Sequence, residues 1–267
     1  MFKLTAFCAL LLVSGFAQPA HAVKKPSRPP AAAPAAPTPP AAVPAAALAI
    51  GYLAQASASP PVMPYFDPVI TDEGQQGARL GIVDNNTTGQ FTKQTFQLQE
   101  TLVPADGDVV AAFKALLAAG RRYLLLNLPA ATIIELAALP EAQQTLLFNI
   151  ASPDDRLRGA DCRANVLHLL PSDAMRADAL AQYLAKKRWQ KWFVAMGASA
   201  ADQRYAEALR RSARKFGNRI VAENTWTHTF DERRTPESSV PVFTQQDDYD
   251  AVIVVDEDLT FGDYVPY

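Results

Sequence analysis

The sequence predicts an α/β fold with parallel sheets flanked by helices, and three observations favour it. Apolar runs without alternation recur along the chain, as in Trp192–Met196 and Ala251–Val255, and such runs are typical of strands buried on both faces. The segments between them carry apolar residues at helical spacing. Strand and helix patterns therefore alternate, which is the order that builds parallel sheets.

Residues 166–197 form one complete strand–helix–strand pattern, the signature of a βαβ unit. Val166–Leu170 is a short apolar run that ends at Pro171. Ser172 predicts a helix N-cap, and Asp173 suits the positive end of the helix dipole. The apolar face of the predicted helix consists of Ala177, Leu180, Ala181 and Leu184.

The first 22 residues predict a secretory signal peptide. Lys3 precedes an apolar run of 13 residues over Leu4–Phe16, which is shorter than the roughly 20 residues that span a bilayer. Residues 20–22 read Ala-His-Ala, an A-x-A cleavage site, so cleavage is expected after Ala22. An uncleaved membrane anchor is the alternative.

Residues 23–47 predict a linker rich in proline and alanine. The segment contains eight prolines, which disfavour helices and sheet ladders and extend the chain. Such a linker can hold a folded part away from a membrane, and the folded part is expected to begin near Leu48.

The other expected elements follow in chain order. They are a strand over 48–53, a helix opened by Asp72 and Glu73, a turn cluster over 84–89, an edge strand within 91–103, a helix over 106–119, a strand over 123–126, a helix over 129–139, a strand over 146–150, a helix over 201–216, a strand over 219–224, a polar loop over 225–240 and a buried strand over 251–255. Gly74, Gly77 and Gly81 either weaken the first helix or mark close packing or the approach of a ligand.

Charge and cysteine content exclude several classes of protein. Loss of residues 1–22 removes Lys3, so 25 basic and 27 acidic side chains become 24 and 27, and the net charge changes from −2 to −3. No basic stripe is present, so no nucleic-acid partner is expected. Cys162 then remains as the one cysteine, which excludes an internal disulfide and a zinc–cysteine cluster. We expect its thiol to be buried as a small hydrophobe.

No catalytic motif is apparent in the sequence. The glycine-rich dinucleotide loop, the phosphate-binding Walker loop, the zinc-protease motif and the nucleophile elbow are all missing. The prediction is a non-enzymatic protein without a cofactor or a metal site. His168 lies in an apolar strand and is expected to be a satisfied core or interface histidine, and His228 to lie at a surface. The acidic clusters at 247–248 and 256–258 favour solvated loops, because the EF-hand spacing is absent.

Polar residues that follow predicted strands are the candidates for ligand contact. In open parallel sheets, ligands bind beyond the carboxyl ends of the strands. Each such residue has an alternative role as a helix cap or a turn former. The candidates are Gln55, Asn127, Ser152, Asp154, Ser199, Trp226 and Asp256.

Several long stretches carry a resemblance to a known family. They read GARLGIVDNNTTGQF, LLFNIASPDDRLRGADCRANVLHLLPSDAMRADALAQYLAKKRW, PVFTQ and FGDYVPY. With the signal peptide and LAIGYL, they resemble the type I periplasmic substrate-binding proteins of ABC transporters, in the leucine/branched-chain amino-acid-binding group. The resemblance covers residues 48–267. It is closer to a subfamily encoded beside pyrroloquinoline-quinone-dependent alcohol oxidation systems.

The resemblance implies two α/β lobes, residues 48–167 and 168–267, with a ligand cleft that closes by hinge motion. It makes residues 166–171 the first crossing between the lobes. It also implies a helix N-terminus after the strand YLLL that holds a ligand carboxylate, with Asn127 and Thr132 as contributing side chains. Pro129 lacks an amide hydrogen, so a weakened amino-acid site is expected. Because relatives continue beyond Tyr267, the second lobe is expected to be incomplete, with an exposed hydrophobic edge.

The expected function is that of a monomeric periplasmic solute-binding protein. Its expected partners are a small-molecule ligand and the membrane permease of an ABC importer or exporter, with a link to quinoprotein alcohol catabolism implied by the resemblance. The alternative is an interaction module of the cell envelope with a degenerate ligand site, favoured by the long linker.

Overall fold

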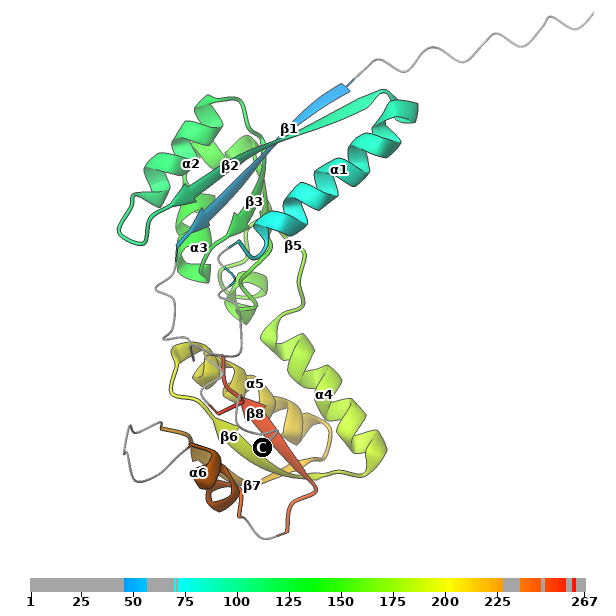
Figure 1. Cartoon of the computed structure of the whole chain (residues 1–267), viewed down its shortest axis with the longest axis vertical. Helices are drawn as coiled ribbons and strands as arrows, with labels where there is room; N and C mark the ends of the chain where they lie inside the picture. The colour runs from blue at the N-terminus through cyan, green and yellow to red at the C-terminus, as the bar shows by residue number, and fades with distance from the viewer. Residues whose placement is uncertain are drawn as a thin grey trace, which may run out of the picture. The chain divides into compact units, whose positions relative to one another are not determined.

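Two parallel sheets flanked by helices make up the computed structural model (Figure 1), which describes residues 46–56, 70, 72–227, 236–245, 248–257 and 261–262. The predicted α/β class with parallel sheets is therefore confirmed. The predicted signal peptide, most of the linker, His228 and the stretch after Gly262 lie outside the described residues. In the described part of the chain, no helix is both long enough and apolar enough to cross a membrane.

The first sheet has five parallel strands in the order β2-β1-β3-β4-β5. Its strands are β1 (Ala46–Gln55), β2 (Gln94–Val103), β3 (Tyr123–Asn127), β4 (Leu146–Asn149) and β5 (Val166–His168). Its helices are α1 (Gln75–Thr92), α2 (Val109–Ala118) and α3 (Ala130–Ala138), with the 3₁₀ turns η1 (Pro140–Gln144) and η2 (Asp155–Arg158). β2 lies at one edge, as its alternating sequence predicted.

The second sheet has three parallel strands in the order β7-β6-β8. Its strands are β6 (Lys191–Met196), β7 (Arg219–Thr225) and β8 (Ala251–Val255), and its helices are α4 (Asp173–Lys187), α5 (Ala200–Lys215) and α6 (Pro236–Phe243). α6 occupies part of the segment predicted to be a polar loop over 225–240, so that prediction is wrong for residues 236–240.

The chain passes from one sheet to the other between β5 and β6. Residues 166–197 therefore do not form a βαβ unit within a single sheet, because β5 pairs with β4 and β6 pairs with β7 and β8. The predicted helix between them is confirmed, since Ser172 Oγ accepts a hydrogen bond from the Met175 amide at 3.4 Å and caps α4. Local sequence identified the elements, and tertiary pairing decided which sheet each strand joined.

The core of the first sheet lies under α2 and α3. Phe113, Leu116 and Ile133 of these helices pack against Leu53 and Leu124 of the strands, and all are buried. A Cβ at Gly51 would lie 2.7 Å from Leu124 Cδ2 and 3.6 Å from Leu116 of α2, so the glycine leaves room for both leucines. Figure 1 shows α1 on the other side of the sheet from α2.

α1 differs most from its predicted form. The helix begins at Gln75, after the two acidic residues, and continues through the segment 84–89 that was predicted to be a turn. Asn86 explains the continuation, because its amide group donates to Phe96 O at 2.9 Å and accepts from Phe96 N at 2.7 Å. These two bonds anchor the helix to β2 and outweigh the low helix propensity of the segment.

The glycines of α1 have different roles. Gly74 has φ +80° and lies close to Tyr52 and Asn127, so the close-packing explanation holds for it. Gly77 and Gly81 have open space around them, and the same explanation is wrong for both. Gly89 approaches β2 so closely that a Cβ would lie 2.2 Å from Gln94 O.

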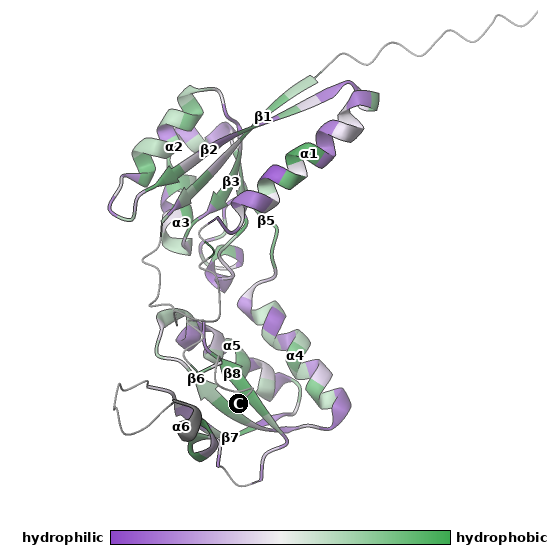
Figure 2. Ribbon diagram, viewed as in Figure 1, coloured by the Kyte–Doolittle hydropathy of each residue, from purple (hydrophilic) through white to green (hydrophobic). Residues whose placement is uncertain are grey.

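The face of the first sheet opposite α2 and α3 is incompletely covered. Tyr123 and Leu146 are register partners and are each 39% exposed, and Leu167, the partner of Phe148, is 43% exposed. In Figure 2 the strands β1 and β3 of this sheet are largely hydrophobic along their length. A strip of apolar surface therefore crosses β3, β4 and β5.

The second sheet has hydrophobic cores on both faces. On one face, Ala181 of α4 and Leu209 of α5 pack against Trp192 and Ile253. On the other, Phe193 packs with Trp226 and Val240, the latter from α6. The buried character predicted for Trp192–Met196 is confirmed. Among the described residues β8 lies at one edge of the sheet, and Val254 is 37% exposed.

Cys162 is exposed rather than buried. It lies in the turn between η2 and β5, where the backbone runs over the surface. The prediction of a buried thiol is therefore wrong, because the loop position overrides the usual preference of cysteine for the interior.

Candidate functional site

Asn127 lies at the carboxyl end of β3, where the loop before α1 approaches the sheet. Its Nδ2 donates to the Tyr52 hydroxyl at 3.0 Å and to the Glu73 carbonyl at 3.2 Å. Gly74 follows in a left-handed conformation, and a Cβ there would lie 3.2 Å from Asn127 Nδ2. The three segments thus form one hydrogen-bonded corner at the end of β1 and β3.

The N-terminus of α3 directly follows this corner. Pro129 is the N-cap, and no side chain caps the helix, whereas α2, α4 and α5 are capped by Asp108, Ser172 and Ser199. The first-turn amides of residues 130–132 therefore have no side-chain acceptor among the described residues. Uncapped amides and the helix dipole together favour an anionic group.

Pro129 contributes no amide hydrogen to this helix terminus. A proline at the N-cap removes one amide, but the three amides of the first helical turn remain. The Pro129 carbonyl accepts the amide of Ile133 at 3.1 Å and so begins the helical ladder. Thr132 is half-buried in this first turn, and its hydroxyl has no partner among the residues the structure describes.

Gln55 lies at the carboxyl end of β1 and ties the strand to the next loop. Its Nε2 donates to the Ala105 carbonyl at 3.0 Å. The Gln55 side chain is half-buried, and its amide donors are used for this internal contact.

Ser152 and Asp154 lie after β4 in a buried polar turn. The fully buried Asn149 organises the turn, because its Nδ2 donates to the Ser152 carbonyl at 2.7 Å and its Oδ1 accepts the Ser152 amide at 2.9 Å. Asp154 Oδ1 accepts the Arg156 amide at 2.9 Å and caps η2. Asp154 therefore acts as a helix cap, the alternative considered for such residues.

His168 joins the same group. Asn149 Nδ2 lies 3.1 Å from His168 Nδ1, so the amide donates and the ring nitrogen accepts. Burial lowers the pKa of His168, and the positive charge of Arg158 lowers it further. The half-buried imidazole is thus favoured in its neutral form, as expected for a satisfied interface histidine.

Asp155 connects η2 to the helices of the second sheet. Its Oδ1 accepts the Ala174 amide in the first turn of α4 at 3.0 Å, and its Oδ2 accepts from Arg211 of α5 at 2.9 Å. The Asp173 amide also donates to the Pro153 carbonyl at 2.9 Å. One carboxylate therefore contacts both helices near the point where the chain passes between the sheets.

Asp173 and Arg204 form an ion pair beside this contact. The Asp173 side chain is fully buried, and Arg204 Nε lies 2.7 Å from its Oδ2. Burial lowers the pKa of Arg204, but the hydrogen bond and charge of Asp173 and the charges of Asp154 and Glu257 raise it overall. The polar residues that follow β4, β5 and β8 thus share one electrostatic environment.

Ser199 and Asp202 form a capping box at the start of α5. The Asp202 amide donates to Ser199 Oγ at 3.0 Å, and the Ser199 amide donates to Asp202 Oδ2 at 3.1 Å. Asp202 Oδ1 also accepts the Glu257 amide at 2.8 Å, which joins the end of β6 to the end of β8. Ser199 is therefore a cap, and its hydroxyl accepts an internal hydrogen bond.

Asp256 and Gly197 complete this strand end. Asp256 Oδ2 accepts the Gly262 amide at 3.0 Å. A Cβ at Gly197 would lie 2.3 Å from Asp202 Oδ2 and 3.1 Å from Asp256 Oδ1. Both carboxylates thus converge on the backbone of Gly197. No group of three His, Cys, Asp or Glu side chains in the described ranges is arranged to hold a metal ion.

Trp226 lies in a cluster of aromatic rings under α6. Its ring centroid is 5.1 Å from those of both Phe243 and Phe261, with edge-to-face geometry. The side chain is 7% exposed. Trp226 thus has the environment of a core residue, although it directly follows β7.

The eight candidates therefore divide between strand ends. Asn127 and Thr132 lie at the end of β3 and the start of α3, Gln55 at the end of β1, and Ser152 and Asp154 after β4. Ser199, Trp226 and Asp256 follow the strands of the second sheet. Sequence reasoning missed Tyr52, Asp155, Arg204 and Asp202, because nothing in the sequence indicates which distant groups they contact.

Comparison with solved structures shows the fold. The chain matches an ABC transporter substrate-binding protein from Desulfitobacterium hafniense with a TM-score of 0.58 and 19% identity, over 78% of this chain and 58% of that one. It matches a branched-chain amino acid ABC transporter periplasmic ligand-binding protein from Burkholderia xenovorans with a TM-score of 0.56 and 16% identity, over 73% and 50% of the chains.

A third structure has the same fold and a bound amino acid. It is the branched-chain amino acid transporter substrate binding protein of Streptococcus pneumoniae in complex with isoleucine, matched with a TM-score of 0.53 and 16% identity over 78% of this chain and 56% of that one. No protein-family model and no curated protein matches the sequence. This chain spans about 58% of the first of these structures, and the arrangement of its sheets and helices is the type I periplasmic-binding-protein fold.

Proposed function

We propose that this chain is the solute-binding component of an ABC transporter. The observation that supports the proposal most strongly is the open N-terminus of α3 at the end of β3, on a fold shared with substrate-binding proteins. In that position, backbone amides and the helix dipole favour the anionic group of a small ligand. The proposed ligand is a small molecule with a carboxylate, and amino acids are the first class to test because structural neighbours were solved with leucine and isoleucine.

We propose that Asn127 and Thr132 contribute directly to this site. The Thr132 hydroxyl has no partner within the described part of the chain, and it lies in the same helical turn as the open amides. Gln55, Ser152, Asp154, Ser199 and Asp256 are proposed as the polar boundary of the site, formed by the strand ends. Trp226 is proposed to support the boundary from the core, because its ring is buried.

The proposed motion is a hinge between residues 48–167 and 168–267. The supporting observation is that the chain changes sheets after β5, where Asp155 contacts the first turn of α4. Backbone rotation on ligand binding is expected to concentrate at residues 169–172. Comparison of ligand-free and ligand-bound structures tests this, and a rotation centred elsewhere contradicts it.

The proposed location is the periplasm. Residues 1–22 are proposed to direct secretion and to be removed by cleavage after Ala22. The A-x-A pattern and the apolar run at 4–16 support this proposal. The proposed protein partner is a membrane permease, and the proposed working form is a monomer. A link to quinoprotein alcohol oxidation rests on the sequence resemblance alone. Sequencing the N-terminus of the secreted protein tests the cleavage.

Ligand binding is tested by thermal unfolding and calorimetry of the chain from residue 23 onward. Leucine, isoleucine, other amino acids, short alcohols and their acids are the probes. A bound ligand at a hundredfold excess over its Kd adds about 2.7 kcal/mol to the free energy of unfolding. Thr132→Val is expected to weaken binding, and Thr132→Ser to retain most of it. A folded protein that no probe stabilises contradicts the proposal and favours an envelope interaction module.

A further inference from the structure

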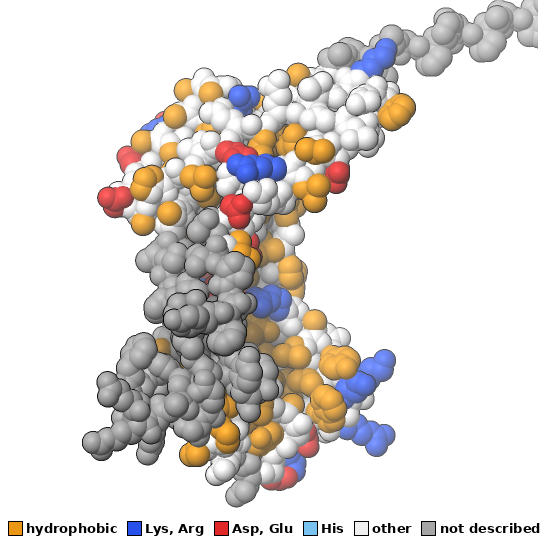
Figure 3. Space-filling view, viewed as in Figure 1, with side chains coloured by type: hydrophobic (Ala, Val, Ile, Leu, Met, Phe, Trp, Pro, Cys, Tyr) orange, Lys and Arg blue, Asp and Glu red, His pale blue; other side chains and the backbone are white. Residues whose placement is uncertain are grey.

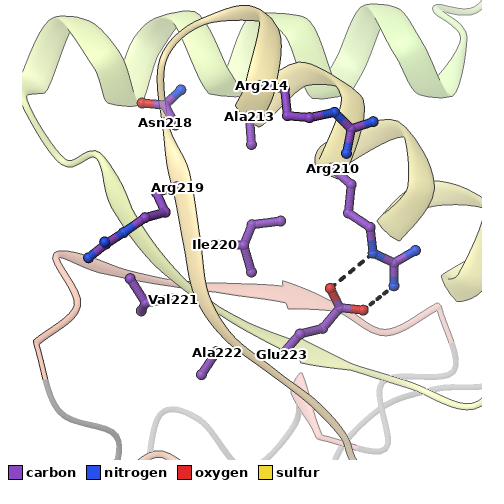
Figure 4. A pocket seen from close by; sticks show the side chains of 9 residues that line it. All are labelled: Arg210, Ala213, Arg214, Asn218, Arg219, Ile220, Val221, Ala222 and Glu223. Atoms are coloured by element: carbon purple, nitrogen blue, oxygen red, sulfur yellow. Dashed lines mark hydrogen bonds and ion pairs between the residues drawn. The ribbon is translucent and has the colours of Figure 1, made fainter.

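An open groove lies along β7 at the edge of the second sheet. It has a volume of about 440 Å³, and Figure 4 shows its lining side chains, which come from the second half of α5, from the turn after it and from β7. The lining includes Arg210, Arg214, Asn218, Arg219, Ile220 and Glu223. This groove contains none of the candidate ligand residues at the strand ends.

One edge of β7 has no strand beside it in the described part of the chain, since the sheet order is β7-β6-β8. The Trp226 amide, directly after β7, donates to Met196 O of β6 at 2.7 Å. Because successive residues of a strand alternate in the direction of their backbone groups, the amides and carbonyls of Thr225 and Glu223 face the open edge, whereas Val221 lies in the bulge where the register with β6 shifts. An extended peptide can pair with such an edge through main-chain hydrogen bonds.

The wall of the groove is fixed by an ion pair. Arg210 forms a bidentate pair with Glu223, in which Nε lies 3.0 Å from Oε2 and Nη2 also contacts Oε1. This pair raises the pKa of Arg210, although its burial acts in the opposite direction. Arg210 therefore links α5 to β7, and its charge is already matched by Glu223.

Two further arginines at the groove have no carboxylate partner like that of Arg210. Arg214 and Arg219 are both exposed and form no ion pair with any residue that the structure describes. Arg219 lies near enough to Asp248 to lower the pKa of that carboxyl group, but the main partner of Asp248 is Lys191. The groove thus carries two guanidinium groups that form no ion pair with a described residue, and it lies beside an open strand edge.

We propose that this groove binds an extended acidic segment of a partner protein, which adds a strand beside β7. Main-chain pairing with Glu223 and Thr225 supplies the alignment, and Arg214 and Arg219 attract carboxylates of the segment. The charges favour this occupant over a second copy of β7, because two copies would bring like-charged arginines together. The second open edge, β8, is apolar and lacks the arginines.

A synthetic peptide tests the proposal by fluorescence anisotropy with the folded chain. β7 has seven residues, so the probe is a labelled peptide of about seven residues in which glutamate alternates with threonine. It is expected to bind, and the same peptide with lysine in place of glutamate is not. N-methylation of alternate backbone amides is expected to abolish binding, because it blocks the main-chain hydrogen bonds.

Protein variants locate the binding surface. The double variant Arg214→Glu with Arg219→Glu is expected to raise the Kd of the acidic peptide at least about tenfold, or about 1.4 kcal/mol. The matched control is Lys186→Glu with Lys187→Glu, an equal change of charge on α4. Both pairs are exposed, so the variants are expected to remain folded, which circular dichroism checks.

Three results overturn the proposal. The first is binding of the acidic peptide that N-methylation leaves unchanged, and the second is an equal loss of binding in the Lys186 and Lys187 control. The third is absence of binding to the folded wild-type chain at low salt, where attraction between charges is strongest.

Discussion

Asp155 and Arg211 form a 2.9 Å ion pair that joins the segment after β4 to α5. The same carboxylate accepts the Ala174 amide at the start of α4. Asp155→Ala is expected to lower the free energy of unfolding by about 1 kcal/mol, because it removes an acceptor from a helix terminus and an exposed ion pair. Urea unfolding measures the loss.

The contribution of the Asp155–Arg211 pair is separable by a double-mutant cycle. Asp155→Ala and Arg211→Gln are expected to show a coupling free energy of about 0.5 kcal/mol, since both side chains are partly exposed. Arg214→Gln is the control on the same helix and is expected to be additive with Asp155→Ala. Zero coupling in the first cycle contradicts the ion pair.

The pair of buried Asp173 and partly exposed Arg204 predicts a larger effect. Asp173→Asn is expected to lower the free energy of unfolding by about 2 kcal/mol, because Arg204 loses a charge-assisted hydrogen bond. Arg176→Gln is the control, since Arg176 Nη1 lies 3.8 Å from Asp173 Oδ1 and the arginine is 53% exposed. Its expected effect is within about 0.5 kcal/mol. Equal losses in both variants contradict this assignment.

Gly197 predicts a steric effect at the end of β6. Gly197→Ala is expected to destabilise the fold by about 2 kcal/mol, because the new Cβ meets the buried carboxylate of Asp202 and displaces the α5 cap. Gly77→Ala in α1 is the matched control, since nothing lies within 4 Å of the added Cβ. It is expected to stabilise the helix by about 0.5–1 kcal/mol. Denaturant unfolding of both variants measures the contrast.

His168 predicts a dependence of stability on pH. Burial lowers the folded-state pKa of His168 below its ordinary value of 6.5, so the unfolded chain binds a proton more readily between the two values. The stability that the neutral His168 side chain contributes to the folded state is therefore present above pH 6.5. It is lost as the pH falls toward the lowered pKa. The free energy of unfolding of His168→Gln is expected to change less between neutral pH and the lowered pKa. An identical slope in both proteins contradicts the prediction.

The apolar strip on the first sheet predicts self-association. Tyr123, Leu146 and Leu167 are partly exposed on adjacent strands, and contiguous apolar surface favours aggregation. Leu167→Lys is expected to reduce light scattering at high concentration with little loss of stability. Val254→Lys on β8 is the comparison at the sheet edge. Unchanged scattering in both variants contradicts a role for these surfaces.

Most of the fold was predictable because it depends on local periodicity. The capped helix after Ser172 and the buried strand at 192–196 follow from patterns within about ten residues. α1 was mispredicted because Asn86 is anchored by β2, a tertiary contact that helix propensity does not take into account.

On the face in Figure 3, lysine and arginine side chains lie in small separate groups over the described residues, in keeping with the absence of a basic stripe from the sequence.

The candidate site was less predictable than the fold. The strand-end rule placed polar residues at the right edge of each sheet, but it did not distinguish caps from free groups. Ser199 and Asp154 proved to be caps, whereas α3 has no side-chain cap. The distinction depends on which residues meet in space, as with Tyr52, whose partner Asn127 is 75 residues away in sequence.

The hydrophobic clusters of the two sheets share no residue among those described: one draws on residues 53–166, and the others on residues 177–261. Each part of the chain thus has its own source of cooperativity. We expect hydrogen exchange to show two groups of amides that open with different free energies, and chemical denaturation to deviate from a single two-state transition. A solute that contacts both parts would couple them, so a saturating ligand is expected to merge the two openings into one.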